Sequence, residues 1–391
     1  MVLQDITVLD LTQLLPGPYC TQILADFGAN VIKIEGPAGD LTRVLGSKLQ
    51  QESGPFVMLN RNKRSVVLNL KKQEGRDIFL RLAKQADVVV EGFRPGVLDN
   101  LGIGYEQATR INEKIIYCSI SGYGQTGPYR NRPGHDINYI SIAGILGNTG
   151  PAGSKPVIPG GQIADITGGF LGVVGIMLAL WAREKTMKGQ YIDVSMMDGA
   201  VAWLPIVLGE YLANKTEPKR GQDLLNGGYA CYNVYETSDN EYMSLGALEA
   251  HFWETFCREI GQESLIAEQF ADKQAQKKMI TKVQDVFSQK TGKEWTVFFQ
   301  DKNVPCEPVL ELEGVLSHPH VLSRGMVVDV DHPVEGKIKQ IGMPIKLSMT
   351  PGEIRTPAPL LGEHTKEILQ EIGLTAEEIS RLTDEKIVQC K

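Results

Sequence analysis

Three side chains lie at positions in this sequence where proton or oxyanion chemistry is feasible. Asp165 directly precedes a long apolar run, His135 lies in the loop that follows Pro133, and Glu249 lies between a strand-like and a helix-like segment. The first free N–H groups of a helix that starts near Asp165 can bind a developing oxyanion beside the carboxyl group. Aspartate is also a favoured helix N-cap, and loop histidines and junction glutamates are usually solvated or capping. Taken singly, each residue favours the structural interpretation.

A basic segment, Asn60–Ser65, precedes one of the expected strands. Guanidinium and ammonium groups bind phosphates through charge-assisted hydrogen bonds, so such cations can form an anion pocket even in an acidic protein. A solvated loop is the alternative, and the cluster alone favours it. Neither GxGxxG nor GxxxxGK[ST] is present, so a nucleotide cofactor held by those fingerprints is unsupported. The cations considered for the pocket are Arg43, Arg61, Lys63, Arg64 and Arg94.

The first half of the chain alternates short apolar segments with helical ones. This βαβ repetition predicts an α/β fold with a mainly parallel sheet and helices on both faces. Ligands of such sheets bind at the carboxyl ends of the strands. The expected strands are Ile6–Leu9, Asn30–Ile34, Ser65–Leu70, Asp87–Glu91, Ile115–Ser119 and Gln190–Val194. The loops expected at their carboxyl ends are Gln13–Pro18, Glu35–Arg43, Glu91–Pro95 and Ser121–Tyr129.

The pattern changes after a polar stretch that begins near residue 214. Two strand-like runs flank a turn at Ser238–Asn240, and a helix-rich segment follows. We expect these to form a smaller α+β domain, with the C-terminal helices returning to the first domain. The expected boundaries are residues 1–214 for the first part of the large domain, 225–330 for the small domain and 331–391 for the return segment.

Composition excludes several classes of protein. The 391 residues are 42% hydrophobic and 22% charged, and 40 basic against 47 acidic side chains give a net charge of −7. We therefore expect no nucleic-acid partner and no membrane partner. The six cysteines have no CxxC spacing, which argues against a zinc site and a disulfide framework. The N-terminus lacks a signal-peptide pattern, and the glycine-containing run Ile166–Ala182 favours a buried helix over a membrane span, so we expect a cytoplasmic protein.

Six segments together point to a known family. They are Gln13–Pro18, Asp26–Pro37, Asn60–Leu70, Val88–Pro95, Lys188–Met197 and Leu361–Thr365. Over essentially its whole length the chain resembles the class III (CaiB/BaiF) acyl-CoA transferase and racemase family. One departure is Gly36, where many relatives carry arginine or proline. The resemblance implies a Rossmann-like large domain, a small domain, and two ring-like chains interlocked as a homodimer.

The resemblance also implies an acyl-CoA substrate that binds mainly to the first domain. The resemblance implies no metal and no redox cofactor. Coenzyme A is part of the substrate and is not counted as a cofactor. The five cations considered above then become the expected phosphate contacts. The residues expected near the pantetheine are Tyr123, Gly124 and Gln125.

Two segments, Gly134–Tyr139 and Gly246–Glu249, are similar to the α-methylacyl-CoA racemase branch. That similarity implies epimerisation of 2-methyl-branched acyl-CoA thioesters, with His135 and Asp165 as the two proton-transfer residues. Each positioned acid or base contributes roughly 10²–10⁴-fold. The Asp165 N–H is expected to bind the enolate oxygen. Glu249 is expected to support His135 across the dimer, and Asp136 is a second candidate for orienting the imidazole.

Two other functions stay open. In a CoA-transferase, Asp165 attacks the thioester and forms a mixed anhydride. A CoA-binding module without activity is a third possibility, but it gives no reason for His135, Asp165 and Glu249 to match the family together.

Overall fold

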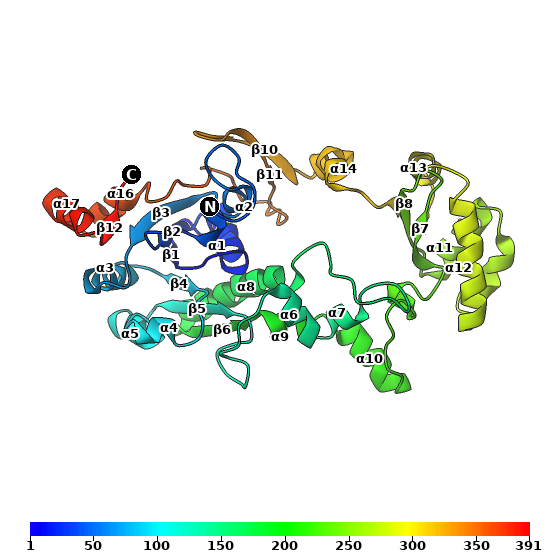
Figure 1. Cartoon of the computed structure of the whole chain (residues 1–391), viewed down its shortest axis with the longest axis horizontal. Coiled ribbons are helices and arrows are strands. Elements are labelled where there is room, and N and C mark those ends of the chain that lie inside the picture. The colour runs from blue at the N-terminus through cyan, green and yellow to red at the C-terminus, as the bar shows by residue number, and fades with distance from the viewer. The chain divides into compact units, whose positions relative to one another are not determined.

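The computed structural model describes all 391 residues, which divide into two compact units (Figure 1). Unit 1 and unit 2 alternate along the chain. Unit 1 comprises Met1–Ala143, Gly161–Trp203 and Pro319–Lys391, and unit 2 comprises Gly144–Gly160 and Leu204–His318. The second unit therefore ends before the hairpin near residue 330, whereas we expected a small domain over residues 225–330.

Unit 1 is built on a seven-stranded sheet with the order β12-β3-β2-β1-β4-β5-β6. Every neighbouring pair is parallel except β12 and β3. The six expected strands are confirmed to within two residues, and β12 forms in the C-terminal segment where we expected only helices. The strands are β1 (Thr7–Asp10), β2 (Asn30–Glu35), β3 (Lys63–Leu68), β4 (Val88–Glu91), β5 (Ile116–Ser121), β6 (Tyr191–Ser195) and β12 (Val388–Gln389).

Helices cover both faces of this sheet. A continuous core joins β1 and β2 residues such as Leu9 and Ile32 to Phe79 of α3 and Leu369 of α16, while α1 and α8 pack together elsewhere in unit 1. The helices of unit 1 are α1 (Pro16–Asp26), α2 (Gly54–Leu59), α3 (Gln73–Ala83), α4 (Val97–Asn100), α5 (Tyr105–Ile111), α6 (Asp136–Ile142), α8 (Ile163–Thr186), α9 (Met196–Val201), α15 (Pro319–Ser323), α16 (Thr365–Glu371) and α17 (Ala376–Asp384), with the 3₁₀ turn η1 (Leu41–Arg43).

A two-stranded hairpin, β10 (Val327–His332) and β11 (Gly336–Ile341), also belongs to unit 1. Its turn residue Glu335 accepts hydrogen bonds from the backbone N–H groups of Gln51 at 3.0 Å and Glu52 at 2.9 Å. These contacts explain why the hairpin groups with unit 1 and not with the helix-rich segment before it.

The apolar helix α8 is buried along one face only. A Cβ at Gly169 would lie 2.8 Å from the Pro16 carbonyl oxygen, and a Cβ at Gly172 would lie 2.9 Å from Cys20 Sγ, so these glycines permit close packing on α1. The side chains of Phe170, Leu178 and Trp181 are exposed. By length and composition alone α8 could cross a membrane, and 39% of its most apolar window is buried. The expectation of a buried helix thus holds only for its glycine face.

Unit 2 contains a three-stranded sheet of order β7-β8-β9, in which the expected hairpin is confirmed as the antiparallel pair β7–β8. Aromatic side chains in contact with one another, among them Phe256, Phe287 and Trp295, contribute to its core. The apolar run Asp198–Leu212 is divided between two helices, because Pro205 starts a new one. The elements are α7 (Ile145–Asn148), α10 (Pro205–Asn214), η2 (Leu224–Asn226), β7 (Tyr232–Glu236), β8 (Tyr242–Gly246), α11 (Ala250–Glu259), η3 (Glu263–Glu268), α12 (Lys273–Phe287), α13 (Gly292–Phe299), β9 (Cys306–Pro308) and α14 (Leu312–Ser317).

Candidate active site

The N-termini of α6 and α8 meet in unit 1, and Asp136 joins them. Its Oδ1 accepts hydrogen bonds from the backbone N–H groups of Ala164 at 2.6 Å and Asp165 at 3.1 Å. A carboxylate is well placed there, because the first N–H groups of a helix lack partners and carry partial positive charge. This bridge brings Asp165 close to the segment that begins with His135.

The bridge changes one expectation about the site. We expected the Asp165 N–H to bind an enolate oxygen and considered Asp136 as a partner of the imidazole. Here the Asp165 N–H donates to Asp136, so that donor is already engaged. The sequence could not show this, because the partner lies 29 residues away along the chain.

The carboxyl group of Asp165 has an unusual protonation equilibrium. Burial, and then the nearby Asp136 carboxylate, raise the pKa of Asp165 to about 7. Both effects disfavour the charged form. Near neutral pH this carboxyl group therefore exists in both forms, and it can either donate or accept a proton.

His135 is exposed and directly precedes α6. Its backbone N–H donates to Asn138 Oδ1 at 3.0 Å, and its carbonyl accepts the Asn138 N–H at 2.8 Å. The backbone of His135 is thus fixed, while its side chain is exposed. An exposed imidazole on a fixed backbone suits a general base that meets its substrate from solvent.

The loop expected to meet the pantetheine follows β5. The backbone N–H of Gln125 donates to Asp193 Oδ2 at 3.0 Å, and the Tyr123 ring packs edge-on against Tyr139, with centroids 5.1 Å apart. Gly124 has a φ of +82°, which other residues rarely adopt. The loop is therefore anchored on the same helix that follows His135.

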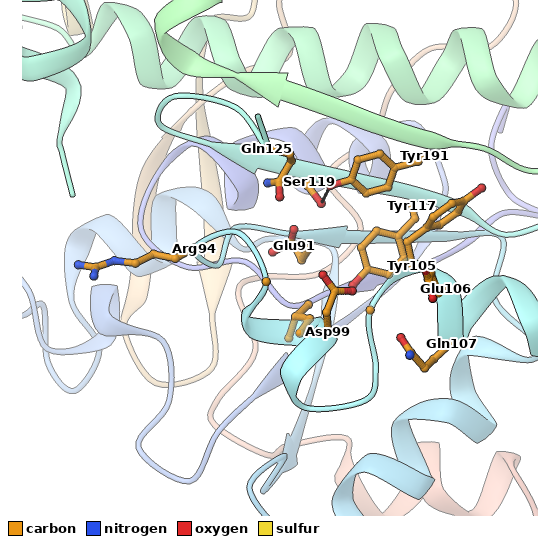
Figure 2. A pocket seen from close by; sticks show the side chains of 13 residues that line it. Glu91, Arg94, Asp99, Tyr105, Glu106, Gln107, Tyr117, Ser119, Gln125 and Tyr191 are labelled. Carbon is orange, nitrogen blue, oxygen red and sulfur yellow. Dashed lines mark hydrogen bonds between the residues drawn. The ribbon is translucent and has the colours of Figure 1, made fainter. Parts of the chain in front are cut away.

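A cavity of about 360 Å³ lies beside β4 and β5, and it is lined by two predicted residues, Arg94 and Gln125 (Figure 2). In Figure 2 the Arg94 guanidinium points away from the side chains around Glu91. Arg94 is exposed and forms no ion pair. Among the predicted cations, Arg94 is therefore the one without an ion-pair partner.

Sequence reasoning did not single out Glu91 as a site residue. Burial raises the pKa of Glu91 to about 7, although its Oε2 accepts the Phe93 N–H at 2.7 Å. Nearby, the Tyr191 hydroxyl donates to Ser119 Oγ at 2.9 Å. The only signal in the sequence was a charged residue at the end of an otherwise apolar strand.

Three predicted phosphate ligands are buried in ion pairs. The Lys63 ammonium donates to Asp10 Oδ2 at 3.0 Å, to Asn60 Oδ1 at 2.9 Å and to the Pro18 carbonyl at 2.9 Å. All three donors of that ammonium are thus used within the fold. Two of the predicted arginines are also buried in ion pairs. Arg43 pairs with Glu35 and Glu52, and Arg61 pairs with Asp26.

These contacts give Arg43, Arg61 and Lys63 structural roles and argue against the phosphate-binding role that we expected for them. Arg64 is partly exposed and pairs with Glu367 and Glu371. These ion pairs hold the Arg64 charge more weakly than the buried pairs hold Arg43, Arg61 and Lys63, because exposed ion pairs contribute little free energy.

Glu249 lies in unit 2, where it is exposed and precedes α11. It occupies the N-cap position without a side-chain capping bond. Its support of His135 stays a prediction.

Comparison with known proteins assigns the chain to a family. A model of CoA-transferase family III matches residues 3–365. The chain is 36% identical over 392 residues to alpha-methylacyl-CoA racemase of Homo sapiens, covering 100% of this chain and 98% of that protein. It is also 36% identical over 377 residues to succinyl-CoA:glutarate CoA-transferase of Homo sapiens, covering 95% of this chain and 86% of that protein.

Solved structures agree with this assignment. A crystal structure of a CAIB/BAIF family protein from Brucella suis matches with a TM-score of 0.84 and 31% identity, covering 94% of this chain and 98% of that one. The chain therefore belongs to CoA-transferase family III, whose members similar to it include both racemases and CoA-transferases.

Proposed function

We propose that this protein epimerises 2-methyl-branched acyl-CoA thioesters, with His135 and Asp165 as its two bases. The observation that carries the proposal is the Asp136 bridge, which holds Asp165 beside the His135 segment while the pKa of Asp165 rises to about 7. A group that is half protonated near neutral pH suits both removal and return of a proton. The similarity to racemases supports the same function.

The proposed reaction moves one proton off the α-carbon and another onto it. Neutral His135 accepts the α-proton of one epimer, and the electron pair of the broken C–H bond moves into an enolate. Protonated Asp165 then donates its proton to the opposite face of the α-carbon, which gives the other epimer. The reverse reaction exchanges the two roles, and solvent restores the starting protonation states.

In this proposal the thioester's CoA portion contacts Arg94 and the Tyr123–Gln125 loop. Arg94 supplies the free guanidinium, which binds phosphate oxygens by charge-assisted hydrogen bonds. The proposal needs no redox cofactor, because no step changes an oxidation state.

A second candidate, CoA transfer, is favoured by the equal identity to a CoA-transferase. In it, the Asp165 carboxylate attacks the thioester carbonyl, CoA leaves as its thiolate, and an aspartyl anhydride forms. That reaction uses only the ionised form of Asp165 and gives His135 no required role, whereas epimerisation uses both forms of Asp165 and both residues. For this reason we place epimerisation first.

Deuterium incorporation distinguishes the two candidates. Each epimer of a 2-methylacyl-CoA is incubated in D₂O with the wild type, His135→Ala or Asp165→Ala. We expect the wild type to deuterate the α-carbon and interconvert the epimers. Each variant should lose interconversion, but it should keep exchange of the one epimer whose proton its remaining base can remove.

Trapping of an anhydride by hydroxylamine tests the CoA-transfer candidate. If the protein is a transferase, acyl-CoA with a carboxylic acid acceptor gives a trappable anhydride on Asp165 that Asp165→Ala abolishes. Such trapping, together with no α-deuteration by the wild type, would rule out the racemase proposal and leave the family assignment intact.

A further inference from the structure

We propose that Tyr139 is a positioning residue, whose hydroxyl holds the His135 loop through the Gly134 carbonyl. The inference rests on the proposed function, in which His135 is a base, and it adds a residue that does not itself touch the substrate. Its evidence is a set of contacts around one buried ring.

The first contact is a short hydrogen bond. The Tyr139 hydroxyl donates to the Gly134 carbonyl oxygen at 2.6 Å, and only 5% of the tyrosine is exposed. Gly134 immediately precedes His135. The carbonyl acceptor therefore belongs to the peptide group whose nitrogen is that of His135.

The second observation is close packing at two glycines. A Cβ at Gly134 would lie 2.7 Å from Tyr139 Cε1, and a Cβ at Gly122 would lie 2.5 Å from the Tyr139 hydroxyl oxygen. Real Cβ atoms do not approach so closely, so both positions fit the ring because they lack a side chain. The ring is thus held between the residue after β5 and the residue before His135.

The surroundings keep the hydroxyl protonated. Burial, and then the carboxyl of Asp165, raise the pKa of Tyr139 well above its usual value. The Tyr123 ring faces it edge-on, and its own helix carries Asp136 at the start. Over the working pH range the hydroxyl therefore remains a donor to Gly134.

These contacts complete the support of the His135 backbone. On one side Tyr139 holds the Gly134 carbonyl, and on the other Asn138 Oδ1 accepts the His135 N–H at 3.0 Å. General-base catalysis depends on heavy-atom placement, and a misplacement of about 1 Å can cost roughly 10²-fold. Loss of the Tyr139 support should therefore lower turnover without removing the base.

The test compares Tyr139→Phe with a matched control, Tyr235→Phe. Tyr235 is also buried, and its hydroxyl donates at 2.7 Å to the carbonyl of Ala230, again five residues earlier. Both variants remove one buried hydroxyl from the same kind of bond. Only the first should affect the His135 loop.

We measure α-proton exchange of each epimer and amide hydrogen exchange of the peptide that covers residues 134–139. For Tyr139→Phe we expect kcat to fall about tenfold with KM within twofold, because placement and not substrate binding is lost. The loss should be greater for the epimer that His135 deprotonates, identified as the one that Asp165→Ala still exchanges. Amides of residues 135–139 should exchange faster, whereas Tyr235→Phe should match the wild type in both measurements.

Several results would overturn the inference. Unchanged amide exchange in Tyr139→Phe would show that the hydroxyl does not hold the loop. Faster amide exchange with unchanged kcat would reduce Tyr139 to a structural residue. If the wild type exchanges no α-proton, the proposed function fails, and amide exchange alone still decides whether Tyr139 fixes the loop.

Discussion

At the scale of single residues, Asp165 acquires its chemistry from its neighbours. An aspartate in water is fully ionised near pH 7, but burial and the adjacent Asp136 raise the pKa of Asp165 to about 7. Perturbed carboxyl groups of this kind concentrate at functional sites, although structural networks produce them too. Burial and then the Asp136 carboxylate, and not the residue type, distinguish Asp165 from an ordinary aspartate near a helix N-terminus.

The raised pKa predicts a stability cost that depends on pH. Because the folded pKa lies above the unfolded one, the folded state binds more protons between about pH 4 and pH 7, so the Asp165 contribution to stability falls over that range. Asp165→Asn removes this effect. We expect it to match the wild type below pH 4 and to be more stable by about 4 kcal/mol at pH 8, because each unit of pKa shift corresponds to about 1.4 kcal/mol.

Urea unfolding from pH 4 to pH 8 measures this difference. The exposed aspartate Asp301 supplies a control, since Asp301→Asn should follow the wild type across the range. A constant difference between Asp165→Asn and the wild type at every pH would contradict the raised pKa.

At the scale of elements, the strands of unit 1 bring charged groups together and then neutralise most of them. The Lys63 ammonium at the start of β3 reaches Asp10 at the end of β1. Burial alone raises the pKa of Asp10, but Lys63 and Lys33 outweigh it and hold this pKa below its usual range. The loop after β4 differs, because it leaves Arg94 exposed and unpaired.

This contrast predicts different outcomes for two cations that looked alike in sequence. Lys63→Ala leaves the Asp10 carboxylate buried without its partner, so we expect a loss of about 3–5 kcal/mol in the free energy of unfolding. Arg94→Ala should change stability by less than about 0.5 kcal/mol. It should raise KM for acyl-CoA about tenfold at similar kcat, because it removes a charge-assisted contact made equally in ground and transition states.

Chemical unfolding and steady-state kinetics on both variants test the contrast. Lys337→Ala is the control for lysine removal, since Lys337 forms an exposed pair with Asp329 and should cost little. A stable Lys63→Ala protein with a raised KM would restore Lys63 as a phosphate ligand.

At the scale of the whole molecule, large apolar side chains remain exposed on two helices. Leu178 and Trp181 of α8 are 65% and 66% exposed, and Ile206 and Leu212 of α10 are 62% and 54% exposed. Clusters of exposed apolar side chains mark interaction sites. We propose that a second copy of the chain covers these faces, in line with the expected homodimer.

Sedimentation at micromolar concentration tests this assembly. We expect the wild type to be a dimer and Leu178→Glu to shift it toward monomer, because a carboxylate in an apolar interface is strongly unfavourable. Glu184→Gln, on the exposed surface of the same helix, should leave the dimer unchanged. A wild type that sediments as an active monomer would refute the proposed interface.

The sequence by itself determined the local elements and the candidate residues of this protein. Short apolar runs predicted the first six strands, because strands of a parallel sheet are buried on both faces. The segments similar to the family identified His135 and Asp165 as candidate residues. The sequence did not reveal that β12 joins the sheet, because its Val388 pairs with Leu68, far along the chain. It also did not show that Lys63 is buried in an ion pair with Asp10, because burial of a lysine is not encoded at its own position.

Only the tertiary structure decided which charges are free and which carboxyl group is perturbed. Asp10 and Lys63 lie 53 residues apart, and Asp136 and Asp165 lie 29 apart. Ion pairing and pKa depend on distance and on burial, and neither quantity is a local property of the chain. Arg94 therefore stands out from the other cations, and Asp165 from the other aspartates, only once the strands and helices are assembled.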